Sequence, residues 1–123
     1  MAGKDRFFMN RNNNLAGKEK RAVNELIMGL KNLYGKNLSK VILYGSKARG
    51  DSTKNSDIDI LIVLKKINTI AEDRKRIYDL AWKASYYYDL LISVAVKEER
   101  SYLELSTPFI MNVKREGVSL WAR

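Results

Sequence analysis

The stretch KVILYGSKARGDSTKNSDIDILIVL, residues 40–64, decides the fold of this 123-residue chain. It begins and ends with apolar, β-branched runs of strand length, at 40–44 and 58–64, which predict two buried strands. A short Gly-Ser turn at 45–50 and a polar loop at 51–55 lie between them. Because about a dozen residues join the two strands, the sequence leaves open a parallel or a mixed pairing.

Helical and strand patterns continue on both sides of this stretch. Apolar residues recur at helical spacing over 15–34 and 69–87, which predicts two amphipathic helices. Asn14 is the expected N-cap of the first helix, and Gly35 is its expected end. The other predicted elements are a third strand over 89–96, a loop over 97–105, a helix over 106–117 and a short edge strand over 118–121. We therefore expect a single α/β (α+β) domain in which helices flank a mixed β-sheet.

Composition excludes several classes of site. The chain has no cysteine and no histidine, which rules out disulfides, thiolate or imidazole metal ligands and Ser-His-Asp triads. A metal would need oxygen ligands, which favours Mg²⁺ or Mn²⁺. No apolar run reaches 18 residues, so no membrane association is expected, and the basic N-terminus lacks the apolar segment of a secretory signal. We expect a cytoplasmic protein.

Positive charge is concentrated at the beginning of the chain. The net charge is +9, and residues 1–40 hold nine basic and only three acidic residues. We interpret residues 1–14 as a flexible basic N-terminal segment and residues 15–123 as the folded domain. A basic leading segment can attract RNA or an acidic protein surface. The alternative interpretation is a solvated helix face followed by a frayed tail.

The Gly-Ser turn has the residues of a phosphate-binding site. Gly45 lets a ligand approach the backbone, and Ser46 offers a hydroxyl and an N–H group where a helix begins. Lys47 and Arg49 can add positive charge near phosphate oxygens. A P-loop is excluded, because the position that needs lysine is Asp51. The competing interpretation is a simple turn from a strand into a helix.

Two carboxylates open the second strand of the motif. Asp57 and Asp59 are two residues apart, so in a strand they lie on one face while Ile58 and Ile60 face the core. Paired carboxylates repel each other, and a divalent cation relieves that repulsion and bridges to phosphate oxygens. The alternative is an acidic strand start that faces solvent.

Asp89 is the candidate third carboxylate. It opens the third predicted strand, so it would converge with the pair if the two strands are neighbours. The alternative is that Asp89 caps the preceding helix. The remaining acidic residues with a less suitable position are interpreted as surface residues: Asp51, Asp73, Asp79 and Glu104.

The aromatic residues are assigned mainly to packing. Trp82 and Trp121 are expected in the core or in an interface, and Tyr44 is expected to be buried. At least one member of the run at 86–88 is expected in the core, because helical spacing spreads three consecutive residues around the helix.

The run Gly45–Gly50, followed by Ser56-Asp57-Ile58-Asp59, resembles the signature of the DNA polymerase β-type nucleotidyltransferase superfamily. Chain length and element order resemble its smallest members, the minimal nucleotidyltransferase (MNT) domains, over residues 15–121. The resemblance implies a nucleotidyltransferase fold, with Gly45, Ser46 and Arg49 at the phosphates. It also implies that Asp57 and Asp59 bind two Mg²⁺ (or Mn²⁺) ions, with Asp89 as the less closely matched third carboxylate.

The resemblance also implies a reaction. A hydroxyl would attack the α-phosphorus of a nucleoside triphosphate, ATP being the expected donor of AMP. MNT domains of this kind are often paired with a HEPN-type partner protein, and the MNT member acts as the antitoxin by nucleotidylylating the toxin. The alternatives are a non-catalytic binding antitoxin and an RNA 3′-end nucleotidyltransferase; a small-molecule acceptor is less favoured without a second domain. A homo-oligomer is compatible with the sequence.

Overall fold

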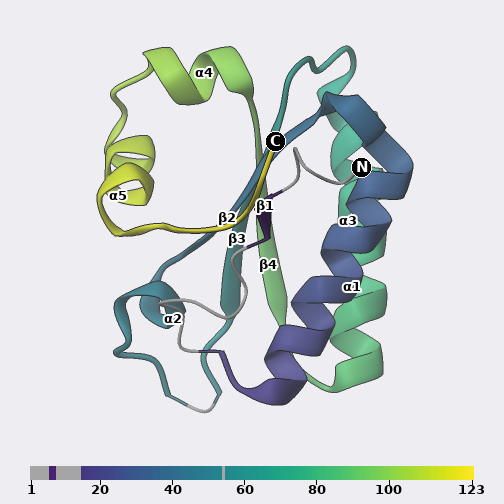
Figure 1. Cartoon of the computed structure of the whole chain (residues 1–123), viewed down its shortest axis with the longest axis vertical. Coiled ribbons are helices and arrows are strands. Elements are labelled where there is room, and N and C mark those ends of the chain that lie inside the picture. Colours follow the sequence, from purple (N-terminus) through teal and green to yellow (C-terminus); the bar gives the residue numbers. More distant parts are fainter. Residues whose placement is uncertain (1–5, 8–14, 54) are drawn as a thin grey trace.

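The computed structural model describes residues 6–7, 15–53 and 55–123 (Figure 1). Its strands are β1 (Arg6–Phe7), β2 (Leu38–Tyr44), β3 (Ile58–Leu64), β4 (Ile92–Glu98) and β5 (Val118–Ala122). Its helices are α1 (Gly17–Tyr34), α2 (Ser46–Arg49), α3 (Ile70–Tyr88), α4 (Glu99–Glu104) and α5 (Pro108–Glu116), and a 3-10 turn, η2, covers Gly35–Asn37. Within these ranges no helix has the length and apolar character needed to span a bilayer.

The strands form one mixed sheet in the order β1-β5-β2-β3-β4, which confirms the expected fold class. β2 pairs antiparallel with β3, and β3 pairs parallel with β4. The expectation that β5 is an edge strand is wrong, because it pairs with β2 on one side and with β1 on the other. Strand β1 comes from the segment 1–14, whose other residues lie outside the described part of the chain.

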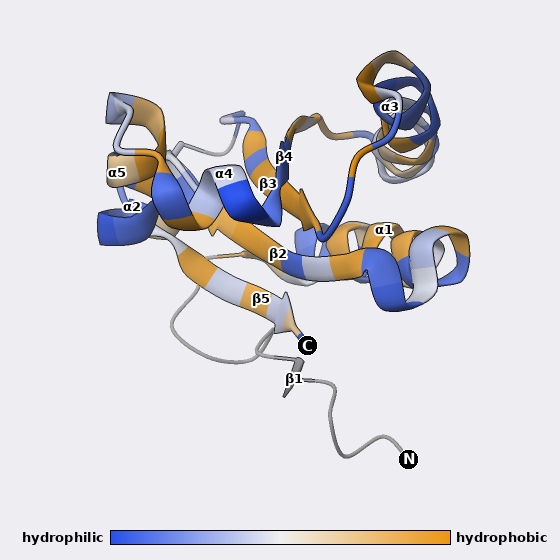
Figure 2. Ribbon diagram, turned by 90° about the horizontal axis from the view of Figure 1, so that it is seen from above, coloured by the Kyte–Doolittle hydropathy of each residue, from blue (hydrophilic) through white to orange (hydrophobic). Residues whose placement is uncertain are grey.

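Helices cover both faces of the sheet. α1 and α3 lie side by side on one face, and α4 and α5 lie on the other (Figure 1). The strands between the two layers are largely hydrophobic (Figure 2). Under α1 and α3 lies a large apolar cluster, which we call the helix-face core, whose largest members are Leu26, Ile27, Leu30, Leu38, Leu43, Ile58, Ile60, Ile62, Leu64, Ile77 and Trp121. Under α4 and α5 lies a smaller one, the site-face cluster, made of Ile42, Leu61, Val63 and Val113.

Local signals explain several helix ends. Gly35 ends α1 in the left-handed region at φ +52°, as predicted, and the Thr107 hydroxyl accepts a hydrogen bond from the Ile110 N–H at the start of α5. The N-cap of α1 is Ala16 rather than Asn14, and the Ala16 N–H donates to the Glu19 carboxylate at 2.8 Å.

Two predictions about the second half of the chain are wrong. Strand β4 begins at Ile92 and not at Asp89, and residues expected as a loop form the end of β4 and helix α4. The charged composition suggested a loop, but Arg100 and Glu104 form an i, i+4 ion pair at 3.3 Å along α4. Tyr102 packs against the site-face cluster, which gives this short helix an apolar anchor.

Exposure separates the aromatic residues. Trp121 is buried, as expected, but Trp82 is 64% exposed and stacks on the exposed Tyr86. Ile70, the first residue of α3, is also exposed. Asp73, expected at the surface, is buried, and its carboxylate accepts a hydrogen bond of 2.7 Å from the Tyr34 hydroxyl.

Candidate functional site

Gly45 brings the chain backbone against a carboxylate. It directly follows β2, is the N-cap of α2, and has φ +74°, a conformation that favours glycine. A Cβ atom at this position would overlap the Asp59 Oδ2 atom and lie 3.2 Å from its Cγ. Glycine is therefore required here for two reasons, backbone conformation and the space taken by Asp59. The following residue, Ser46, is the first residue of α2.

Asp57 and Asp59 lie together at the start of β3. Asp57 precedes the strand and is exposed, whereas Asp59 is half-buried within it. Burial raises the pKa of the Asp59 carboxyl, the neighbouring Asp57 charge raises it further, and Arg49 lowers it. The pair therefore carries unfavourable like-charge repulsion, which a bound cation would relieve. Its carboxylate oxygens are of the type that Mg²⁺ and Mn²⁺ prefer.

A row of three residues crosses the sheet at this level. Tyr44 of β2 and Ser93 of β4 are the register partners of Asp59 on its two sides. The Tyr44 ring is half-buried and meets Phe109 of α5 edge-to-face, with centroids 5.3 Å apart. Burial, and then the Asp59 charge, raise the pKa of the Tyr44 hydroxyl. Tyr44 and Phe109 thus form an aromatic wall beside the carboxylate, and neither this wall nor Ser93 was predicted.

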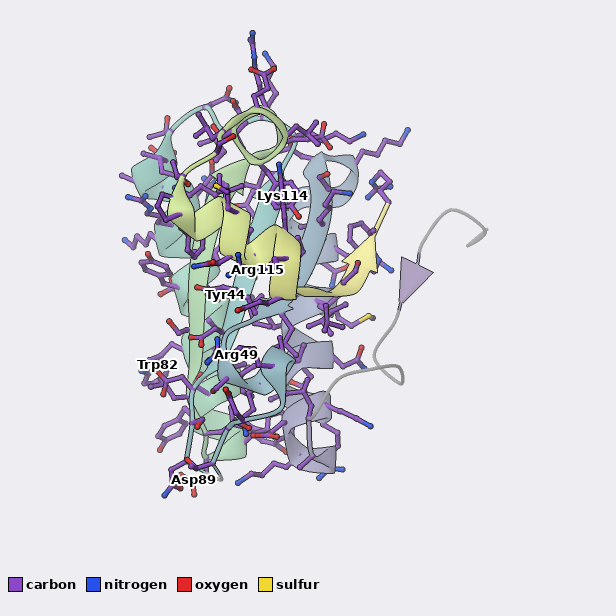
Figure 3. The ribbon with its side chains drawn as sticks, turned by 90° about the vertical axis from the view of Figure 1, so that its left-hand side faces the viewer. Tyr44, Arg49, Trp82, Asp89, Lys114 and Arg115 are labelled. Carbon is purple, nitrogen blue, oxygen red and sulfur yellow. The ribbon has the colours of Figure 1, made fainter. Side chains whose placement is uncertain are left out.

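Arg49 stands at the rim of the site. It ends α2, below Tyr44 in Figure 3, and its side chain is 42% exposed. Its guanidinium forms ion pairs with Asp51 at 3.1 Å and with Glu116, at the end of α5, at 3.3 Å. These contacts hold a positive charge close enough to Asp59 to lower the pKa of that carboxyl.

Lys47 does not point to the site, which corrects the expectation that it adds charge near phosphates. It is buried, and its Nζ atom lies 2.6 Å from a Glu19 carboxylate oxygen in the first turn of α1. The same ammonium donates to the Thr53 carbonyl at 3.4 Å. Lys47 therefore fastens α2 and the following loop to α1.

Asp89, the predicted third carboxylate, does not join the carboxylate pair in this structure. It ends α3 in the left-handed region at φ 54°, and its N–H donates to the Tyr86 carbonyl. Figure 3 shows it at the lower end of the molecule, beyond Arg49. No three acidic residues of the described ranges come together in a group that could hold a metal. α3 ends only one residue beyond the expected helix, but β4 begins at Ile92, so Asp89 lies in the cap between the two elements and not in the strand.

A separate hollow of about 670 Å³ lies between α1 and the loop after α2. Lys18, Glu19, Lys47 and Asp89 are among its lining residues, whereas Asp57 and Asp59 are not. Size alone therefore does not identify the functional site.

Comparison with known proteins gives concordant matches. The sequence model of the nucleotidyltransferase domain family matches residues 23–120. Two Methanocaldococcus jannaschii proteins, both named as candidate protein adenylyltransferases, are similar to this chain. One is 40% identical over 68% of this chain and 79% of its own length, and the other is 36% identical over 84% and 98%. A solved structure described as a toxin–antitoxin with AMP-PNP is 26% identical, with a TM-score of 0.53 over 80% of this chain and 72% of that chain.

Proposed function

Because this chain belongs to the nucleotidyltransferase domain family, it is an enzyme that transfers nucleotides, and we propose that it moves AMP from ATP to a hydroxyl of a partner protein. The observation that carries the proposal is the contact between the Gly45 backbone and the Asp59 carboxylate, beside Asp57. In this proposal, the turn that would hold the triphosphate is next to the carboxylate pair that would hold a divalent cation. The names of the two relatives favour adenylyl transfer to protein, and the AMP-PNP structure favours ATP as donor.

The turn is the part that we assign to the triphosphate. Gly45 allows the phosphates to approach the backbone, and Ser46 supplies a hydroxyl and an N–H group at the beginning of α2. Arg49 supplies the positive charge at the rim, where its guanidinium can contact phosphate oxygens in exchange for its exposed ion pairs. These groups would stabilise the negative charge that accumulates on the leaving pyrophosphate.

Asp57 and Asp59 fit a divalent cation. Burial, and then the Asp57 charge, raise the pKa of the Asp59 carboxyl, so a cation would stabilise the two carboxylates side by side. The chain has neither cysteine nor histidine, so the ligands of that cation would be oxygen atoms. Mg²⁺ or Mn²⁺ held by the pair and by phosphate oxygens would stabilise the pyrophosphate and lower the pKa of the attacking hydroxyl. In the transfer, the acceptor oxygen bonds to the α-phosphorus, the bond from that phosphorus to the bridging oxygen of pyrophosphate breaks, and the hydroxyl proton leaves to water.

The proposed acceptor is a HEPN-type toxin, for which this chain would be the antitoxin. The similarity to a toxin–antitoxin structure and the resemblance to MNT domains support this assignment. A second candidate is a binding antitoxin that neutralises its partner without catalysis. It is favoured by one observation, that only two carboxylates come together in the described residues. Transfer to RNA 3′ ends depends on the basic segment 1–14, most of which lies outside the described residues.

Label transfer from α-³²P-ATP tests the proposal. The protein is incubated with Mg²⁺ or Mn²⁺ and an extract of the source cells, beside Asp59→Asn and the exposed control Asp79→Asn. A labelled protein band that disappears with Asp59→Asn and persists with Asp79→Asn is the expected result. A label in RNA instead of protein would show that RNA is the acceptor. If Asp59→Asn neutralises a partner protein without any label transfer, the binding antitoxin would be favoured.

A further inference from the structure

The parallel pairing of β3 and β4 identifies the residue beside Asp59. In this ladder Asp59 is opposite Ser93, and Leu61 is opposite Ala95. Directly opposite residues of neighbouring strands lie on the same face of a sheet. Since Leu61 and Ala95 both pack in the site-face cluster, Asp59 and Ser93 lie on the same site face, two residues earlier in each strand.

We propose that Ser93, and not Asp89, occupies the third position of the site, so that two carboxylates and one hydroxyl face the nucleotide. This inference rests on the proposed function, since it describes the same site. Asp89 is excluded by its place at the end of α3, three residues before β4 begins. Ser93 is next to Asp59 because hydrogen-bonded strands are about 4.8 Å apart.

The replacement of a carboxylate by a hydroxyl changes how the site holds a cation. A serine hydroxyl is neutral, so the pair and Ser93 supply two negative charges where three carboxylates would supply three. Because the affinity of an oxygen site rises with the number of charged ligands, this site binds a free divalent ion weakly. The triphosphate supplies the missing negative charge, so the cation and ATP bind together and the cation alone does not bind tightly.

The surroundings of Ser93 leave room for a larger side chain. Ser93 and its same-face neighbour Ala95 are both only half-buried. β4 is the outer strand on this side of the sheet within the described residues, so nothing described pairs beyond it. An aspartate at position 93 therefore extends toward Asp59 or toward solvent without entering the core.

Mn²⁺ binding without nucleotide or acceptor tests this inference separately from catalysis. Titration followed by electron paramagnetic resonance compares the natural chain with Ser93→Asp, the neutral control Ser93→Asn, Asp89→Asn and Asp59→Asn. We expect Ser93→Asp to bind Mn²⁺ about tenfold more tightly than Ser93→Asn, which adds no charge, and Asp89→Asn to match the natural chain. An unchanged affinity in Ser93→Asp, or a loss in Asp89→Asn equal to that in Asp59→Asn, would overturn the inference. A failure of nucleotide transfer alone would leave this comparison intact and would count only against the proposed function.

A measurement on the unmodified chain covers the case in which Ser93→Asp does not fold. Mn²⁺ broadens the nuclear magnetic resonance signals of amides close to the bound ion. With ATP present, we expect the Ser93 amide signal to disappear at Mn²⁺ levels that leave the Asp89 signal sharp. The opposite order of broadening would contradict the assignment of Ser93.

Discussion

The sheet face under α1 and α3 is closed by the helix-face core, whereas the face under α4 and α5 has the smaller site-face cluster and half-buried positions around Asp59. Both faces belong to the same strands, and side chains along β3 alternate between them. The first face holds Ile58 and Ile60, while the second holds Asp59 and then Leu61. Strand β3 thus contributes apolar packing on one face and a charged site on the other, where repulsion between Asp57 and Asp59 lowers the stability of the fold.

Core truncations on the two faces should give the largest difference in stability. Ile60→Ala removes a fully buried side chain from the helix-face core and is expected to lower the free energy of unfolding by about 4 kcal/mol. Leu61→Ala, on the site face, should cost about 2 to 3 kcal/mol, because the smaller cluster beside half-buried residues can relax around the cavity. Urea unfolding of both variants measures the difference. Equal losses would show that the two faces contribute alike.

Gly45→Ala tests the contact between the turn and the carboxylate. The added methyl group meets Asp59, so we expect nucleotide transfer to fall by about 100-fold, with the fold retained. The matched control is Gly35→Ala, where φ is also positive at +52° but no atom lies within 4 Å. It should share the backbone strain, about 1 kcal/mol, and leave transfer unchanged. An equal loss of transfer in both variants would show that backbone strain, and not contact with Asp59, causes the loss.

The sequence predicted the part of the site that depends on neighbouring residues. β3 begins and ends where its apolar pattern does, and Asp57 and Asp59 lie together as the two-residue spacing requires. The prediction failed where contacts between residues distant in the chain determine the position of a side chain. Lys47 was predicted to lie near phosphate because its neighbours in the sequence do not reveal its partner. That partner, Glu19, is 28 positions away in the chain. Asp89 precedes apolar residues that suit a strand start as well as a helix end, and the late start of β4, at Ile92, leaves it outside the strand.

Removal of the hydrogen bond between Tyr34 and Asp73 on the helix face should have a smaller effect on stability. The Tyr34 hydroxyl donates to the buried Asp73 carboxylate, so Tyr34→Phe is expected to cost about 1 kcal/mol, whereas Tyr78→Phe at an exposed site should cost little. Burial, and then Asp73, raise the pKa of the Tyr34 hydroxyl. In the unfolded chain this group ionises near pH 10, so its stabilisation is complete below about pH 10 and is lost as the pH rises further. Thermal unfolding from pH 7 to 11 should show an alkaline loss that is smaller in Tyr34→Phe.

Arg49→Gln should have the smallest effect on stability. Its ion pairs are exposed, so we expect no measurable change in the free energy of unfolding, as for the control Arg76→Gln on α3. Transfer should respond differently in the two variants. The KM for ATP should rise with Arg49→Gln alone, because only this guanidinium stands at the phosphate site. A large stability loss in Arg49→Gln would mean that the rim of the site is structural.

Parallel measurement of thermal unfolding and label transfer in Asp59→Asn tests the division between the faces most directly. Because the folded-state pKa of the Asp59 carboxyl is raised, the unfolded chain ionises first as the pH increases, and the fold loses stability between the two pKa values. At neutral pH and without metal, Asp59→Asn should therefore melt at or above the temperature of the natural chain while transfer falls below detection. A lower melting temperature, or transfer that persists, would contradict the assignment of Asp59 to a site maintained at the expense of stability.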